Sequence, residues 1–209
     1  MEAACTIAEL PCSTYCGAMT FAPMGIAGLL EITPRRLSDE RGYFAELYRV
    51  DAFARAAGDV AFVQENESLS ERAGTLRGLH FQSEPHAQGK LVRCTAGALF
   101  DVAVDLRPGS PTFGQWAGVE LSAANGRQLW IPAGFAHGFC TLEPRTVITY
   151  KVTAYYSAAH DKGIAWDDPD IAVAWPDIAD PATLSPKDRV QPQLAQLSGD
   201  LIGGGQPCA

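Results

Sequence analysis

The sequence consists of short apolar runs that Gly, Pro, Asn or Asp interrupts about every 8 to 12 residues. This spacing is typical of an all-β sandwich or barrel, in which short strands alternate with turns. We expect only two short helices, one after Asp51 as N-cap and one after Ser185, with Pro186 in the first turn, where proline is tolerated. The expected strands span residues 28–33, 43–49, 61–68, 75–82, 90–95, 99–106, 116–122, 127–131, 138–142, 146–152 and 171–175.

The chain is long enough for one domain with a sizeable core, since 47% of its 209 residues are hydrophobic. Residues 1–24 carry little charge and show no convincing period, so we assign them to an N-terminal extension, which need not be ordered. Residues 196–209 end in Gly-Gly-Gly-Gln-Pro-Cys-Ala and are expected to form a flexible tail. The working domain is therefore residues 25–195.

Charge and cysteine placement narrow the class of protein. The net charge of −8 has the wrong sign for a protein that grips a nucleic-acid backbone, although a local basic cluster could still bind a small anion. No apolar run approaches the roughly 20 residues that span a bilayer, and no basic residue precedes Arg35. Cys94 and Cys140 lie in strand-like runs and the other four cysteines lie near the termini, so reduced thiols fit best. We expect a soluble, cytoplasmic protein with no nucleic-acid or membrane partner.

The expected strand 61–68 is unusual because neither of its faces is simply apolar. Read with period two, it places Phe62, Gln64, Asn66 and Ser68 on one face and Ala61, Val63, Glu65 and Glu67 on the other. A solvent-facing edge strand would explain this pattern. The alternative is a strand that lines a polar pocket inside a barrel.

Two histidines stand in spacings similar to the half-motifs of the cupin family. Residues 126–137 fit G-x5-P-x-G-x2-H, with a tight turn at 132–134 before His137. Residues 74–82 begin like the other half-motif, G-x5-H-x-H, with His80 in place and Gln82 where the second histidine would stand. Two histidines fall short of the usual three ligands of a catalytic metal, and an amide is a poor substitute for imidazole. We therefore expect no bound metal; a purely structural role for both histidines is the alternative.

Several other chemically capable residues belong to the same stretches. Strict alternation would put Arg77 and His80 on opposite faces, but a bulge at Gly78 would reset the register. A helix cap would explain Asp188, because Ser185-x-x-Asp188 is a capping pattern in which the carboxylate of the last residue reaches back to the cap. Lys90 and Tyr150 lie inside expected strands.

From residue 25 to residue 194, about 170 of 209 residues, the chain resembles the dTDP-4-dehydrorhamnose 3,5-epimerase family. The resemblance implies an all-β, cupin-type jelly-roll barrel with a few short helices, acting without a cofactor or metal. Ala154, where the family usually has an acidic residue, and the extension are departures from the family pattern. The matching runs are 39–46 (DERGYFAE), 62–68 (FVQENES), 76–82 (LRGLHFQ), 88–93 (QGKLVR), 100–107 (FDVAVDLR), 131–139 (IPAGFAHGF), 149–151 with 155–157, 166–169 (WDDP) and 184–188 (LSPKD).

The resemblance also implies residue roles. His80 would be the general base, Asp188 would orient its imidazole, and Tyr150 would be the acid on the opposite face of the sugar. Lys90 and His137 would lie near the sugar ketone, and Asp101 could orient His137. The family is usually a homodimer with strands exchanged between subunits, which we expect here. Positions that would hold the thymidine diphosphate and the sugar are Arg41, Phe44, Glu46, Gln64, Asn66, Arg77, Tyr155 and Trp166.

The implied reaction is epimerisation of dTDP-4-dehydro-6-deoxy-D-glucose to dTDP-4-dehydro-L-rhamnose. A ketone at C4 acidifies the hydrogens at C3 and C5, so the enzyme needs a base, an opposed acid and a positive charge at the enolate. Three alternatives remain. The first is an epimerase acting at C3 or C5 alone on a related sugar, and the second is a non-catalytic sugar-nucleotide-binding cupin. The third, a metal-dependent cupin oxygenase, is disfavoured by Gln82.

Overall fold

The computed structural model describes residues 19–197. Residues 1–18 of the assigned extension, residues 198–209 of the assigned tail, and Cys5, Cys12, Cys16 and Cys208 lie outside the described residues. Within them, Cys94 and Cys140 are buried free thiols.

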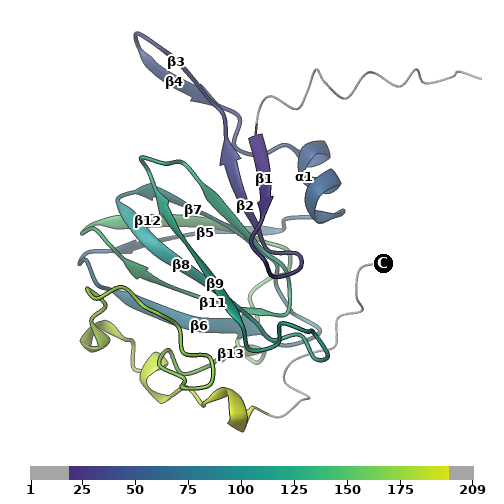
Figure 1. Ribbon diagram of the computed structural model, residues 1–209, viewed down its shortest axis with the longest axis vertical. Helices are drawn as coiled ribbons and strands as arrows, with labels where there is room; N and C mark the ends of the chain where they lie inside the picture. Colours follow the sequence, from purple (N-terminus) through teal and green to yellow (C-terminus); the bar gives the residue numbers. More distant parts are fainter. Residues whose placement is uncertain (1–18, 198–209) are drawn as a thin grey trace, which may run out of the picture.

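Two antiparallel sheets form the body of the molecule, as the all-β prediction requires (Figure 1). A separate hairpin of β3 (Arg36–Asp39) and β4 (Gly42–Ala45) projects from this body. The six-stranded sheet has the order β1 (Met19–Pro23), β2 (Leu30–Pro34), β10 (Gln128–Ile131), β7 (Lys90–Ala96), β12 (Thr146–Val152), β5 (Gln64–Ser70). The five-stranded sheet has the order β13 (Asp161–Gly163), β6 (Leu76–Gln82), β11 (Phe135–Thr141), β8 (Ala98–Asp105), β9 (Trp116–Ser122).

Helical structure in the described residues is short. The helix α1 (Val50–Ala57) confirms the first expected helix but begins earlier than expected, with Arg49 as N-cap and Asp51 in the first turn. In place of a helix after Ser185 there is one 3-10 turn, η2 (Asp188–Val190), and similar turns occur at η1 (Pro181–Thr183) and η3 (Leu194–Gln196). No helix within residues 19–197 has the length and apolar character needed to cross a membrane.

The expected strand 171–175 is wrong. Ile171, Val173 and Trp175 instead pack on the outer face of the five-stranded sheet without joining a ladder, so their apolar character reflects burial alone. The strands β1, β3 and β13 were not expected, and β1 lies within the segment assigned to the extension. The remaining expected strands overlap observed ones.

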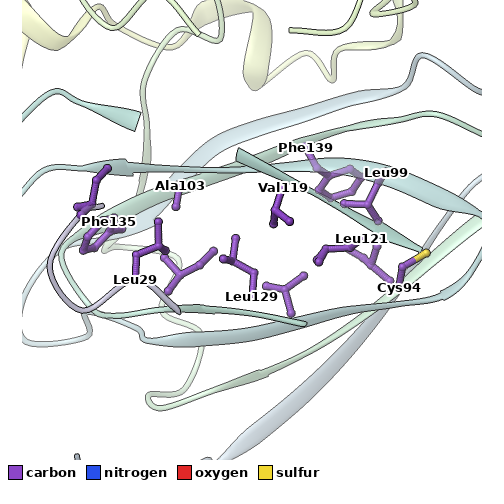
Figure 2. Close-up of a cluster of buried hydrophobic side chains, with 13 residues drawn as sticks. Leu29, Cys94, Leu99, Ala103, Val119, Leu121, Leu129, Phe135 and Phe139 are labelled. Atoms are coloured by element: carbon purple, nitrogen blue, oxygen red, sulfur yellow. The ribbon is translucent and has the colours of Figure 1, made fainter. Parts of the chain in front are cut away.

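The main core fills the space between the two sheets (Figure 2). Leu99 and Leu121 come from one sheet and Leu129 from the other, and all three are fully buried. Along β7 the residues that face inward change from Lys90 at one end to Val92 and Cys94 in this core. One end of the barrel is therefore packed with apolar side chains, and the polar residues gather at the other.

Candidate active site

A cavity of about 490 Å³ opens at the Lys90 end of the barrel. It brings together five residues predicted for the site, namely His80, Lys90, Tyr150, Gln64 and Asn66. The other lining residues are Glu67, Phe81, Gln82, Gln88, Tyr156, Asp161 and Lys187.

A bulge in β6 sets the register of His80 against β11. His80 lies opposite His137 of β11, but Arg77 lies opposite Phe139, so two residues of β6 face one of β11 at this point. The bulge predicted at Gly78 is confirmed. Gly78 has φ +120°, and a Cβ there would lie 2.5 Å from Gly138 Cα, so only glycine fits without a shift of the backbone.

His80 forms a short pair with Asp188. Its Nε2 lies 2.5 Å from Asp188 Oδ1, on a side chain that is buried, whereas one third of the His80 side chain is exposed. Burial opposes ionisation of Asp188, but hydrogen bonds from His80, the Ser185 hydroxyl and the Gly78 backbone hold its pKa below the ordinary value. An ionised carboxylate can only accept, so Nε2 donates this hydrogen bond. Of the two ring nitrogens of His80, which lines the cavity, Nδ1 is the one that Asp188 leaves available.

The capping pattern predicted at Ser185 and Asp188 forms only in part. The Asp188 backbone N–H donates to Ser185 Oγ at 3.1 Å. The predicted reach of the carboxylate to the cap backbone is not formed, because the helical turn begins at Asp188 itself, with Lys187 as N-cap, and the carboxylate accepts from His80.

A second histidine–carboxylate pair lies beside the first. His137 Nε2 is 2.7 Å from Oδ1 of Asp101, which is completely buried. His137 is itself buried behind the cavity lining, directly across the ladder from His80. Asp101 is close enough to Lys90 that its charge favours the protonated amine. Asp101 therefore helps to keep Lys90 protonated.

Lys90 is a buried cation whose Nζ donates to the His80 carbonyl at 3.4 Å. Burial lowers its pKa from 10.5 to about 8, although Asp101 and Asp161 oppose this shift. Near neutral pH the amine is mainly protonated, so it can stabilise a developing negative charge.

Tyr150 projects from the six-stranded sheet, whereas His80 projects from the five-stranded sheet, so the two residues belong to opposite walls of the cavity. Burial raises the pKa of Tyr150, while the charge of Arg77 and a hydrogen bond with Asn66 oppose the shift. The phenol is therefore protonated at neutral pH and is available as a proton donor.

The polar strand β5 combines both explanations offered for residues 61–68. It is the edge of the six-stranded sheet, and Glu65 on its outer face pairs with Lys151 at 2.9 Å. On its inner face, Gln64 Nε2 donates to Asn66 Oδ1 at 2.8 Å, and both side chains line the cavity.

The family model described as dTDP-4-dehydrorhamnose 3,5-epimerase matches residues 23–196 of the chain. The chain belongs to this family. A dTDP-4-dehydrorhamnose 3,5-epimerase from Sinorhizobium fredii is 59% identical over 179 residues, which cover 86% of this chain and 91% of that protein. A dTDP-4-dehydrorhamnose 3-epimerase from Streptomyces niveus is 41% identical and covers 85% of each chain.

Solved structures of the dTDP-4-dehydrorhamnose 3,5-epimerase family share the fold. The crystal structure of the dTDP-6-deoxy-D-glucose-3,5-epimerase from Legionella pneumophila, in complex with dTDP-4-keto-L-rhamnose, superposes with a TM-score of 0.84 and 44% identity. The superposition covers 90% of this chain and 99% of the Legionella pneumophila chain. The cupin-type jelly roll predicted from the sequence is confirmed.

Three residues that the family resemblance assigned to the substrate lie away from this chain's own cavity. Arg41 and Phe44 are exposed on the projecting hairpin, and Glu46 follows it. In the ladder, Lys90 pairs with the last residue of β10, and β2 runs from there toward the opposite end of the barrel before the hairpin begins.

The other residues that the resemblance assigned to the substrate, Arg77, Tyr155 and Trp166, lie outside the cavity lining. Arg77 is exposed and donates to Ser70 Oγ and to the Leu69 carbonyl at the end of β5. Trp166 packs against the apolar cluster of Leu76, Cys140 and Leu184. Tyr155 is exposed and lies outside the lining, which contains its neighbour Tyr156.

Sequence reasoning missed a polar group in the lining. Asp161 Oδ2 accepts from Lys187 Nζ at 2.5 Å and from the Tyr156 hydroxyl at 3.1 Å. Lys187 and Tyr156 stand inside quoted family motifs, next to Asp188 and Tyr155, so proximity in sequence could have found them. Asp161 carried no such signal. Within residues 19–197, no cluster of three or more His, Cys, Asp or Glu residues could hold a metal ion.

Proposed function

We propose that the chain epimerises dTDP-4-dehydro-6-deoxy-D-glucose at C3 and C5, giving dTDP-4-dehydro-L-rhamnose through enolate intermediates. The observation that carries this proposal is the placement of His80, paired with Asp188, and Tyr150 on opposite walls of one cavity that also contains Lys90. This is the arrangement that an epimerisation with a separate base and acid needs.

In the proposed reaction His80 Nδ1 removes the proton from the carbon beside the ketone, and the electron pair of the C–H bond moves onto the C4 oxygen. Lys90 and His137 stabilise this enolate oxygen by positive charge and hydrogen bonding. Asp188 stabilises the imidazolium that forms. Tyr150 then gives its proton to the opposite face of the same carbon, which inverts the centre. No electrons leave the substrate, so the chemistry requires no redox cofactor.

The nucleotide part of the substrate accounts for the cations around the cavity. Lys187 lines it and Arg77 lies nearby, and a diphosphate pairs well with ammonium and guanidinium groups. Gln64, Asn66 and Tyr156 supply hydrogen bonds and an aromatic surface. An acidic protein thus binds an anion through local charge.

We further propose a homodimer in which the β3–β4 hairpin of one subunit completes the cavity of the other. The hairpin exposes Leu37, Tyr43 and Phe44, of which Phe44 is 69% exposed, and an isolated two-stranded hairpin has little stability in water. This arrangement would bring Arg41, Phe44 and Glu46 to the partner's substrate. Because Cys94 and Cys140 are free thiols, we place the enzyme in the cytoplasm.

Incubation with the proposed substrate in heavy water, with the deuterium located by NMR, tests the proposal. Deuterium at C3 and C5 with inversion at both carbons is the expected result. Label and inversion at one carbon would instead establish a single-site epimerase, the activity named for the Streptomyces niveus relative. Absence of label under binding conditions would show a non-catalytic sugar-nucleotide-binding protein.

A further inference from the structure

The side chain of Gln82 lines the cavity and bonds to two loops where these loops meet. It is only 7% exposed, and its amide bonds to three backbone groups. Nε2 donates to the carbonyls of His86 at 2.7 Å and Tyr155 at 3.2 Å, and Oε1 accepts from the N–H of Ser157 at 2.7 Å. Both amide hydrogens and the amide oxygen are therefore engaged.

The two loops are residues 83–89, between β6 and β7, and residues 153–160, between β12 and β13. Further contacts join the same loops around Gln82. Gln88 Nε2 donates to the Ala154 carbonyl at 2.7 Å, and the N–H of Ser83 donates to the His160 carbonyl at 3.0 Å. The rings of His86 and His160 lie 4.4 Å apart. Gln82 is the buried centre of this contact between the two loops.

The 153–160 loop contributes Tyr156 to the cavity lining. The Tyr156 N–H donates to Gln64 Oε1 at 3.2 Å, and its hydroxyl donates to Asp161, which also accepts from Lys187. The position of this loop therefore sets where the Tyr156 ring lies in the lining, and through the Tyr156 hydroxyl the loop contacts the Asp161–Lys187 ion pair. None of the side-chain bonds of Gln82 goes to His80, Lys90 or Tyr150.

We infer that Gln82 is a positioning residue that seats the 153–160 loop over the cavity, so that Tyr156 and Lys187 meet the nucleotide part of the substrate. The inference rests on the proposed function. An imidazole at this position, as in the metal-binding half-motif, has only two nitrogens and could not serve three backbone groups. Glutamine at position 82 therefore has a function of its own in place of metal binding.

The variant Gln82→Glu tests this role because it keeps the acceptor oxygen and removes both donors. We expect the Kd for dTDP and the KM for the sugar nucleotide to rise about tenfold, the effect of losing one or two hydrogen bonds, with kcat within about twofold. Hydrogen–deuterium exchange in residues 153–160 should become faster. Lowering the pH should restore dTDP affinity in this variant alone, since a protonated carboxyl regains one donor.

The matched control is Asn125→Asp, in a turn at the other end of the barrel. Asn125 also donates to a backbone carbonyl, that of Glu120 at 2.9 Å, and accepts from the N–H groups of Ser122 and Arg127. This variant should lose a comparable amount of stability without a change in dTDP affinity. If Gln82→Glu does not fold, Gln82→Met, which fills the same volume, should show the higher Kd without the recovery at low pH.

Two results would overturn the inference. One is faster exchange in the 153–160 loop with unchanged dTDP affinity, and the other is a fall in kcat with unchanged KM, which would mean that Gln82 acts on the chemistry. A wild-type chain that binds dTDP but does not turn over the sugar would contradict the proposed reaction alone. In that case, the role of Gln82 would still be overturned if Gln82→Glu bound dTDP with the same Kd as wild type.

Discussion

Asp188 contacts two neighbours at once, because its backbone N–H donates to Ser185 Oγ while its carboxylate accepts from His80. The contact with Ser185 alone would make Asp188 a stability residue. The 2.5 Å contact with His80 is the basis of its proposed role, in which it fixes the histidine tautomer and stabilises the imidazolium. Substitution of the carboxylate by an amide separates these functions, since the backbone contact survives.

We expect Asp188→Asn to lower kcat about 10³-fold or more, as in other oriented histidine bases, with a small change in melting temperature. Asp180→Asn is the control, because Asp180 caps a short turn, through Ala182, and pairs with Arg72. It should leave kcat unchanged. If Asp188→Asn instead lowers the melting temperature but leaves turnover per folded molecule normal, the carboxylate serves stability and not the reaction.

The lowered pKa of Lys90 predicts that activity and stability change in opposite directions as the pH rises. Burial holds its pKa at about 8 in the folded protein, against 10.5 for an ordinary lysine. Below pH 8 the folded protein carries a buried charge, which in the proposed reaction stabilises the enolate but lowers the stability of the fold. As the pH rises from about 8 to 10.5, the unfolded chain binds more protons than the folded one, so this residue's contribution to stability increases while kcat falls.

Denaturant unfolding and kcat measured across this pH range check the prediction. Lys90→Met should have a low kcat that no longer falls as the pH rises through about 8, and its stability should rise less with pH than that of wild type. A wild-type kcat that stays constant through this range would show that the charge of Lys90 is not used.

At the scale of elements, the edge strand β1 of the six-stranded sheet packs against helix α1. It pairs with β2 along its whole length, and Met19 and Phe21 join the apolar cluster that contains Phe53 of α1. The rings of Phe21 and Phe53 lie 6.4 Å apart in an edge-to-face arrangement. No predicted site residue precedes Arg41, so β1 contributes to stability and not to chemistry.

Truncation should therefore have a sharp boundary. Deletion of residues 1–18 should leave turnover and melting temperature intact. Deletion of residues 1–23 should cost about 2 to 5 kcal/mol of unfolding free energy, because a buried Met and a partly buried Phe lose their contacts. Urea unfolding of both variants measures the difference. Equal stability of the two would show that β1 is dispensable.

The elements that sequence could predict are those bounded by turn residues, such as 116–122 and 146–152, whose bounds agree with β9 and β12. The bulge at Gly78 was predictable because glycine stood where the register had to change. The three-residue strand β13 has too few residues to show a period. The strand predicted at 171–175 was wrong because burial against a sheet face and membership of a sheet produce the same apolar pattern.

Within the site, residues on one strand or in one motif were predictable, and contacts between distant segments were not. The sequence pattern placed Gln64 and Asn66 on one face, but nothing in it joined Asp161 to Lys187. The distance of Arg41 from the cavity was likewise hidden, because it depends on the path of β2 past the barrel.

At the scale of the whole molecule, the hairpin and the cavity lie at opposite ends of one barrel. In the proposed dimer, the hairpin of one subunit reaches the cavity of the other. If the partner supplies Arg41, two inactive variants should complement each other. We expect a mixture of Arg41→Glu and His80→Ala, unfolded and refolded together, to regain about a quarter of wild-type activity, since half of the dimers would be mixed and would each contain one intact site. Activity no greater than the sum of the separate variants would place Arg41 outside the partner's site.

The central claim is that a base and an acid act from opposite walls of the cavity, and Tyr150→Phe tests it most directly. Loss of the hydroxyl leaves the ring volume nearly unchanged, so packing should suffer little. In heavy water His80 should still form the enolate and return deuterium to the same face, so NMR should show label without inversion at the carbon that Tyr150 serves, which we expect to be C5. Inversion at both carbons at the wild-type rate would contradict the account.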